Sequence, residues 1–275
     1  MVKMTNSTYK PNNIQLASWN VNSLNVRLEQ VLDWLQENPA VAALGIQETK
    51  LSDNKFPLEA FSRAGWHATF LGQKTYNGVA LISKQPLTDV VYNNPLLASD
   101  GQARLITATL SICANTSVRI LNGYFPNGQR PESEKFVYKM QWLDALEAWL
   151  RKNLNTYEKL VLMGDFNIAP EDADSHDPKN LRETIHHTTQ ERDHFKKLLA
   201  YGMVDAFRLF QQPEKSFSWW DYREISFRRN RGLRIDHILI SEALKDAVQA
   251  CLIDKEPRKK KRPSDHTPVV IALDL

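Results

Sequence analysis

Several apolar stretches of the sequence end in carboxylate or carboxamide side chains that could hold a metal ion or activate a water molecule. The apolar run at residues 160–163 is followed by Gly164, and then by Asp165 and Asn167. Residues two apart on an extended chain point to the same face. Polar groups at the end of a buried strand are costly unless something pairs with them. Asp165 and Asn167 are therefore predicted to serve a site at the end of a central strand.

The same pattern recurs at other strand ends, which carry Asn20, Asn22, Glu48 and Tyr124. Carboxylates and amides without a cysteine cluster are hard oxygen donors, and they suit Mg²⁺, with Mn²⁺ as a substitute, better than zinc. Glu48 is the best single candidate for a metal ligand because it is a lone carboxylate that closes an apolar strand. Asp165 could either bind the metal or deprotonate an attacking water.

A further pair is predicted between Asp236 and His266. Asp236 lies within an apolar run, so it should be buried and should need a partner. His266 follows Asp265 just before the last apolar stretch and is the natural candidate. A carboxylate beside an imidazole fixes its tautomer and favours its charged form.

Each of these residues also has an ordinary structural interpretation. Glu48 could be a solvated turn residue, Asn20 and Asn22 could cap the following helix, and Tyr124 and His266 could simply be core residues. Taken singly, most are better explained in that way. Taken together, the ordinary interpretation would have to hold at five separate strand ends, so we favour a shared site.

The elements that must position these residues form two strand–helix–strand units. Strands are predicted at residues 14–20, 41–46, 77–82, 105–112, 118–122, 160–163, 217–220, 235–240 and 269–273. Helices are predicted at residues 26–35, 136–150, 193–201 and 242–250. This order suggests an α/β fold with two sheets packed face to face and helices outside.

The chain has 275 residues, of which 42% are apolar, and a net charge of +3, which by itself is no strong argument for nucleic acid. Residues 14–275 are predicted to form a single domain, because no linker-like segment divides them. Residues 1–13 are polar and are predicted to be a disordered extension. No apolar run is long enough to span a membrane, and the two distant cysteines suggest reduced thiols in a cytoplasmic protein.

Residues 215–234 combine six basic side chains and two acidic ones with several aromatic rings. Basic groups bind phosphates, and aromatic rings can fill the space of a missing or displaced base. The alternative is an aromatic core strand followed by a solvated basic loop. The basic run at residues 258–262 is interpreted as a solvated loop near this surface rather than a nuclear signal.

The sequence resembles the exonuclease III family of abasic-site endonucleases, within the endonuclease/exonuclease/phosphatase superfamily. The matching segments are residues 18–24, 47–50, 76–80, 122–128, 164–170, 217–223, 231–236 and 263–268. The resemblance implies a DNase I-like four-layer α/β sandwich. It also implies Mg²⁺-dependent cleavage of the phosphodiester 5′ to an abasic site, with 3′–5′ exonuclease and 3′-phosphatase or phosphodiesterase activity.

The resemblance assigns roles to individual residues. The implied catalytic residues are Tyr124, Asp165, Asn167, Asp236 and His266. The implied metal site draws on Asn20, Asn22, Glu48, Asp165, Asn167, Asp265 and His266. The implied DNA contacts are Lys74, Tyr76, Asn77, Arg104, Trp219, Trp220, Arg223, Arg228, Arg229, Arg231 and Leu233. The implied partner is double-stranded DNA with abasic sites or damaged 3′-ends, bound by a monomer with no membrane involved.

Two other functions remain open at this point. One is a phosphoesterase of the same superfamily that acts on inositol phosphates or sphingolipids, which the tandem tryptophans and the basic segment disfavour. The other is a DNA-binding relative without catalysis, which the intact set of polar strand-end residues disfavours.

Overall fold

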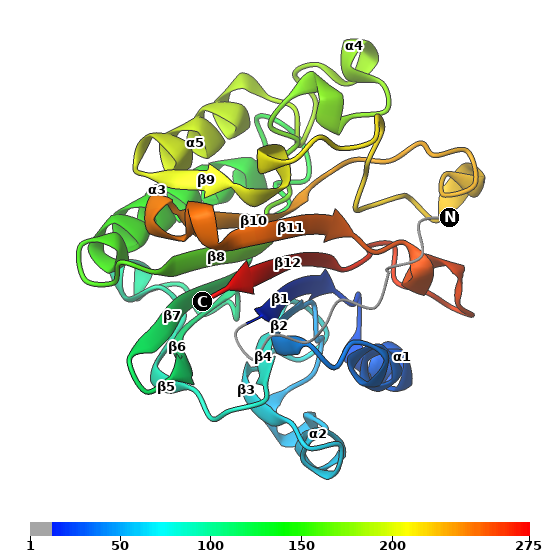
Figure 1. Ribbon diagram of the computed structural model, residues 1–275. Helices are drawn as coiled ribbons and strands as arrows, with labels where there is room; N and C mark the ends of the chain where they lie inside the picture. The colour runs from blue at the N-terminus through cyan, green and yellow to red at the C-terminus, as the bar shows by residue number, and fades with distance from the viewer. Residues whose placement is uncertain (1–12) are drawn as a thin grey trace.

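The computed structural model describes residues 13–275, which form two six-stranded mixed β-sheets (Figure 1). The first sheet has the order β11-β12-β1-β2-β4-β3, and the second has the order β5-β6-β7-β8-β10-β9. The strands are β1 (Asn13–Asn20), β2 (Val41–Gln47), β3 (His67–Leu71), β4 (Val79–Ser83), β5 (Thr88–Tyr92), β6 (Leu105–Cys113), β7 (Thr116–Tyr124), β8 (Leu160–Asp165), β9 (Met203–Asp205), β10 (Asp236–Ser241), β11 (Val248–Ile253) and β12 (Val269–Asp274).

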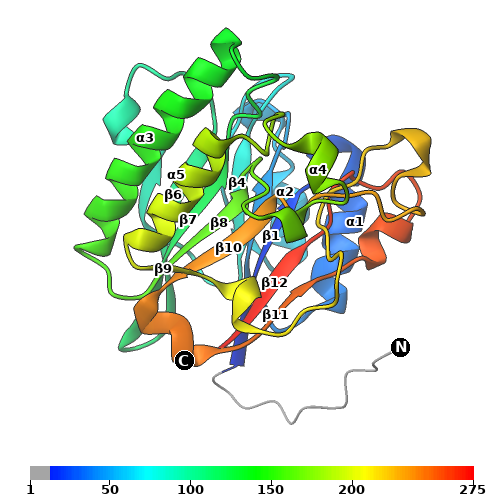
Figure 2. The same ribbon diagram turned by 90° about the horizontal axis from the view of Figure 1, so that it is seen from above.

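Helices cover the outer faces of both sheets, so the molecule has four layers (Figure 2). Helices α1 (Leu24–Glu37) and α2 (Leu58–Arg63) pack on the first sheet, and α3 (Glu134–Leu154) and α5 (Thr189–Ala200) pack on the second. A short helix, α4 (Pro178–Leu181), lies in the connection before α5. One apolar cluster fills the space between the sheets, and two others lie beneath the helices. The predicted α/β sandwich is confirmed.

The sheet topology explains why polar residues gather at one edge. Strands β1 and β2 run parallel, as do β7 and β8, and the remaining pairs are antiparallel. Carboxyl ends of adjacent parallel strands lie at the same edge of a sheet. The ends of β1 and β2 therefore deliver Asn20 and Glu48 together, and the ends of β7 and β8 deliver Tyr124 and Asp165 together.

A close approach of β7 and β8 requires glycine at the end of β8. Gly164 pairs with Gly123 and has a φ of 151°, and a Cβ at Gly164 would lie 1.9 Å from the Gly123 carbonyl oxygen. No side chain fits at that distance, so only glycine allows the chain to present Asp165 next to Tyr124.

Two predicted elements are wrong. Residues 217–220 do not form a regular strand, because their amides bond to loop carbonyls of Leu233 and Asp265 and only isolated bridges form. The predicted helix at residues 242–250 is a 3₁₀ helix at Glu242–Ala247 followed directly by β11. Of the predicted extension at residues 1–13, only Asn13 lies within the described residues, and it begins β1. Within residues 13–275, no helix has the length and apolar character needed to cross a membrane.

Candidate active site

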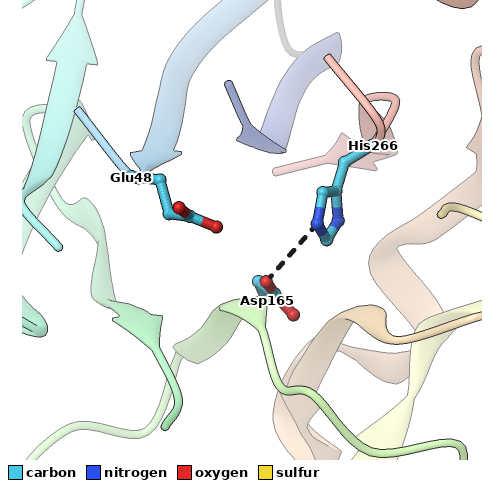
Figure 3. Close-up of side chains that lie close together, drawn as sticks. All are labelled: Glu48, Asp165 and His266. Carbon is cyan, nitrogen blue, oxygen red and sulfur yellow. Dashed lines mark ion pairs between the residues drawn. The ribbon is translucent and has the colours of Figure 1, made fainter. Parts of the chain in front are cut away.

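Glu48, Asp165 and His266 come together from three separate elements (Figure 3). Glu48 follows β2, Asp165 ends β8 and His266 precedes β12. One potential ligand atom from each lies within 4.8 Å of the others, and Nε2 of His266 is 3.7 Å from Oδ2 of Asp165. The three residues belong to both sheets, so the packing of the two sheets creates the cluster.

Asn20 links the two carboxylates of this cluster. Its Nδ2 donates hydrogen bonds of 2.8 Å to Oε1 of Glu48 and of 2.8 Å to Oδ2 of Asp165. Its Oδ1 accepts from the backbone N–H of Asn22 at 2.9 Å. Asn20 is completely buried, so the amide holds both carboxylates in place across the junction of the sheets.

Asn22 and Asp265 lie beside the cluster and also engage in hydrogen bonds. Nδ2 of Asn22 donates to Oδ1 of Asp265 at 2.9 Å, and Oδ1 of Asn22 accepts from Nζ of Lys50 at 2.5 Å. Lys50 also pairs with Oε2 of Glu48 at 2.8 Å. Oδ2 of Asp265 accepts from Nε1 of Trp219 at 3.0 Å. Lys50 thus supplies a positive charge against a carboxylate predicted to bind metal.

The predicted pairing of Asp236 and His266 is confirmed. Nδ1 of His266 lies 2.9 and 3.0 Å from the two Asp236 carboxylate oxygens, and both residues are buried. Asp236 is held in turn by Oγ of Ser218 at 2.6 Å. Burial alone would lower the pKa of His266, but Asp236 and Asp165 outweigh it and raise that pKa to about 10. The imidazole is therefore positively charged at neutral pH, with its Nε2–H directed toward Asp165.

The acid–base properties of Asp165 suit proton transfer near neutral pH. Burial raises its pKa to about 7, against the opposing effect of the His266 charge. A general base works best when its pKa is close to the working pH. Burial together with the charges of Glu48 and Asp165 raises the pKa of Tyr124, so its hydroxyl stays protonated and can donate a hydrogen bond.

Asn167 is fixed by contacts on all of its polar groups. Its backbone N–H donates to Oδ1 of Asp165 at 3.0 Å, and its Nδ2 donates to the carbonyl of Phe125 at 3.1 Å. Its Oδ1 accepts from Nδ2 of Asn127 at 3.2 Å. Asn167 adopts a left-handed backbone conformation with φ of 52°, which asparagine tolerates better than most residues.

Two grooves lie beside this polar cluster, since the lining of each includes a residue that bonds to Asn167 or Asp265. One has a volume of about 560 Å³ and includes Tyr124 and Asn127 in its lining, together with the predicted DNA contacts Tyr76, Asn77 and Arg104. The other has a volume of about 440 Å³, and its lining includes His186 and the predicted DNA contacts Trp219, Arg223, Arg231 and Leu233. Lys74 is exposed, and its sequence neighbours Gln73 and Tyr76 line the first groove. Arg228 and Arg229 are exposed in the loop beside the second groove.

The prediction that Trp220 contacts DNA is wrong. It is completely buried, its Nε1 donates to Oδ1 of Asn230 at 3.1 Å, and its ring packs edge-on against Phe227. It therefore cannot reach DNA in this structure and instead supports the loop that carries Trp219. Arg258 is likewise buried, with its guanidinium over the Trp220 ring, whereas residues 259–262 are exposed as predicted.

Some residues that position the site were not singled out from the sequence. Lys50, Asn127 and Ser218 each contact a predicted site residue directly. Lys50 lies two residues after Glu48, and Ser218 directly precedes Trp219, so both could have been included as neighbours of predicted site residues. Asn127 lies three residues after Tyr124, within the matching segment 122–128, but its contact with Asn167 joins residues 40 apart and could not be predicted from the sequence.

A buried histidine next to the site gives a prediction for acid stability. His237 is buried; its Nδ1 lies 3.0 Å from Nη1 of Arg234, and its Nε2 lies 2.9 Å from the Ile168 carbonyl. Burial, aided by the Arg234 charge, lowers its pKa to about 4. The unfolded chain therefore takes up this proton at a higher pH than the native state does. The contribution of neutral His237 to the stability of the folded protein is complete above about pH 6.5 and is lost as pH falls toward 4.

Between pH 6.5 and 5, we expect His237 to account for a loss of roughly 1.5 kcal/mol in the free energy of unfolding. Urea denaturation of the wild type and of His237→Gln at both pH values isolates this contribution from that of Asp165, whose raised pKa acts in the opposite direction. Equal pH dependence in the two proteins would contradict the assignment.

Comparison with known proteins identifies the family of the chain. Residues 17–266 match the model of the Endonuclease/Exonuclease/phosphatase family. Exodeoxyribonuclease III from Haemophilus influenzae is 35% identical over 264 residues, which cover 93% of this chain and 98% of that protein.

Solved structures give the same result. The 3′ phosphatase NExo from Neisseria, bound to a product DNA hairpin, is 45% identical with a TM-score of 0.92, and the match covers 95% of this chain and 100% of that one. An AP endonuclease from Archaeoglobus fulgidus is 36% identical with a TM-score of 0.89 over the same shares. The chain therefore belongs to the Endonuclease/Exonuclease/phosphatase family.

Proposed function

We propose that this chain is a metal-dependent DNA-repair nuclease that hydrolyses phosphate esters at the 3′-ends of duplex DNA, as a 3′–5′ exonuclease and a 3′-phosphatase. The observation that carries the proposal is the convergence of Glu48, Asp165 and the Asp236–His266 pair at one edge of the two sheets. The Neisseria relative at 45% identity, described as a 3′ phosphatase, supports the choice of 3′-ends.

Incision 5′ to an abasic site is a second proposed activity of the same site. Support comes from the Archaeoglobus fulgidus relative, described as an AP endonuclease, at 36% identity. Trp219 lines the groove beside the cluster and offers apolar surface to a sugar that has lost its base, and Leu233, which is only 4% exposed, packs against it.

The donor set fits a hard divalent cation, and we propose Mg²⁺, with Mn²⁺ able to substitute. The carboxylates of Glu48 and Asp165 are oxygen donors, and no thiol is among the clustered groups within residues 13–275. Asn22, Asp265 and Asn167 complete the proposed surroundings of the ion. When bound, the ion would supply charge stabilisation to a phosphoryl oxygen.

The chain's own residues account for the movement of protons. Asp165 accepts a proton from the attacking water, since its pKa of about 7 makes it a base that is largely ionised just above neutral pH. Asn20 and the backbone N–H of Asn167 hold the carboxylate in one orientation. The charged His266 and the hydroxyl of Tyr124 donate to the phosphoryl oxygens as negative charge develops on them.

We also propose that residues 14–275 act as one catalytic domain in the cytoplasm and bind duplex DNA as a monomer. The exposed side chains Lys74, Tyr76, Arg223, Arg228, Arg229 and Arg231 are the proposed backbone contacts, with Asn77 and Arg104 in the groove wall.

One gel assay tests the proposal. Three duplexes would be compared with and without EDTA: one with a 3′-phosphate, one with a recessed 3′-hydroxyl end and one with a single abasic site. We expect release of the 3′-phosphate and shortening from the recessed end, both abolished by EDTA. Faster hydrolysis of an inositol phosphate than of all three duplexes would establish the alternative phosphoesterase function.

The proposed metal ligand gives a prediction of its own. Glu48→Ala should raise the Mg²⁺ concentration for half-maximal activity by at least about 10-fold, because a ligand to the ion is lost. Glu59→Ala, which removes an exposed carboxylate from α2, is the control and should leave the Mg²⁺ titration unchanged. An unaltered titration curve for the Glu48 variant would remove Glu48 from the metal site.

A further inference from the structure

A lysine lies completely buried behind the loops that begin at Tyr124 and Asp165, which we call the catalytic loops. Lys139 projects from α3, and none of its side chain is exposed. Its Nζ forms an ion pair with Glu191 of α5, whose side chain is also fully buried. Burying two charges costs free energy that their attraction often fails to offset. A buried pair is therefore weak support for a role in stability alone, and its other contacts suggest what else it does.

The remaining hydrogen bonds of Lys139 go to the catalytic loops. Nζ donates to the carbonyl of Asn167 at 2.8 Å and to the carbonyl of Asn127 at 3.3 Å. Asn127 and Asn167 follow the parallel strands β7 and β8, and their side chains bond to each other. One ammonium group thus ties together the two loops that begin at Tyr124 and Asp165.

Glu191 connects the same lysine to a third segment. Its Oε1 accepts from the backbone N–H of His186 at 3.1 Å, and its Oε2 accepts from the N–H and hydroxyl of Thr188 at 3.1 and 2.8 Å. Thr188 caps α5 in return through a bond to the Glu191 N–H at 3.1 Å. The capping box of α5 is therefore joined directly to the catalytic loop.

These contacts converge on the backbone of Asn167. Its carbonyl accepts from Nζ of Lys139 and lies 2.7 Å from Nδ1 of His186. The residue has a left-handed φ of 52°, which the surrounding structure must maintain. In this conformation its N–H reaches Oδ1 of Asp165 at 3.0 Å.

We infer that Lys139 and Glu191 are positioning residues for catalysis: they hold Asn167 in its left-handed conformation and thereby orient Asp165. This inference rests on the proposed function, because its main readout is hydrolysis of a DNA phosphate ester. Neither residue touches the substrate, and both act through the Asn167 N–H.

The fold offers a matched control pair. The side chains of Glu147 of α3 and His194 of α5 are also buried and in contact between the same two helices, and within residues 13–275 neither side chain bonds to the loops that begin at Tyr124 and Asp165. The double variant Lys139→Met with Glu191→Gln removes the charges of the first pair. The double variant Glu147→Gln with His194→Gln disrupts the second pair.

We expect the Lys139/Glu191 double variant to lose about 10²-fold in kcat on a 3′-phosphate duplex, with KM unchanged, because a small displacement of a catalytic group costs about that factor. The Glu147/His194 double variant should keep its kcat at a temperature where both proteins are folded. Equal kcat values for the two double variants, whether both normal or both reduced, would overturn the inference.

Backbone amide hydrogen exchange provides a readout that does not depend on activity. Protection of the Asn167 amide should fall in the Lys139/Glu191 variant and stay normal in the control pair. The single variant Glu191→Gln keeps oxygen and nitrogen atoms for the helix cap, and should show the same local loss of protection if the double variant fails to fold. Should the wild type hydrolyse no DNA, the proposed function fails, while unchanged exchange at Asn167 would refute the positioning role separately.

Discussion

Asp165→Asn should lower the rate of 3′-phosphate removal by about 10³-fold, in the range expected when a positioned general base is lost. The amide is nearly the same size as the carboxylate, and its single oxygen can still accept either from Asn20 or from the Asn167 N–H, but not from both. It cannot take a proton from water. The measurement is a single-turnover assay at saturating Mg²⁺, compared with the wild type.

Binding separates a chemical defect from a structural one. The variant should bind a 3′-phosphate duplex with wild-type affinity in a gel-shift titration, because the groove residues are untouched. Near-normal turnover would remove Asp165 from its proposed role. Loss of binding together with turnover would show that the residue supports the groove rather than the chemistry.

Arg234→Met should lower the free energy of unfolding by about 3–5 kcal/mol, because it removes the ion pair of the buried Asp205 and leaves the buried Asp174 with Arg208 alone. The guanidinium is almost fully buried and pairs with Asp174 at 2.6 Å and Asp205 at 2.8 Å. It also contacts Nδ1 of His237, the residue that follows Asp236. Urea denaturation followed by circular dichroism measures the change.

Arg208→Met is the matched control for this prediction. Arg208 also pairs with Asp174, at 2.6 Å, but its side chain is 34% exposed. Water can replace much of the solvation that Arg208 gives to Asp174, so the loss in the free energy of unfolding should stay below about 1 kcal/mol. Equal losses for the two arginine variants would mean that burial does not govern the strength of this network.

The central part of the fold and of the site could be predicted because strand ends carry their own signal. Glu48 and Asp165 are polar residues that close strongly apolar stretches, and parallel pairing then brings them to one edge. Asp236 needed a partner because it was surrounded by apolar residues, and His266 supplies it. Edge strands such as β5 (Thr88–Tyr92) escaped prediction because no residue of that strand is buried, which leaves a weak apolar pattern.

The features that could not be predicted depend on contacts between residues far apart in sequence. Trp219 and Trp220 are adjacent, so at most one of them could face a groove on an extended chain, but the sequence does not say which. Lys139 and Glu191 are 52 residues apart, and the sequence around neither residue predicts that they pair. The capping box at Thr188 was readable, whereas its link to the catalytic loop was not.

The strand order of the first sheet links the assembly of that sheet to the assembly of the site. Strand β12 lies between β11 and β1, so a segment late in the sequence fills an interior position of a sheet that also contains β1 and β2. His266 directly precedes this strand. A folding chain that has formed the second sheet, with Asp165 in place, therefore still lacks His266 at the site until β12 pairs with β1. One strand-pairing step thus completes both the sheet and the cluster of Glu48, Asp165 and His266.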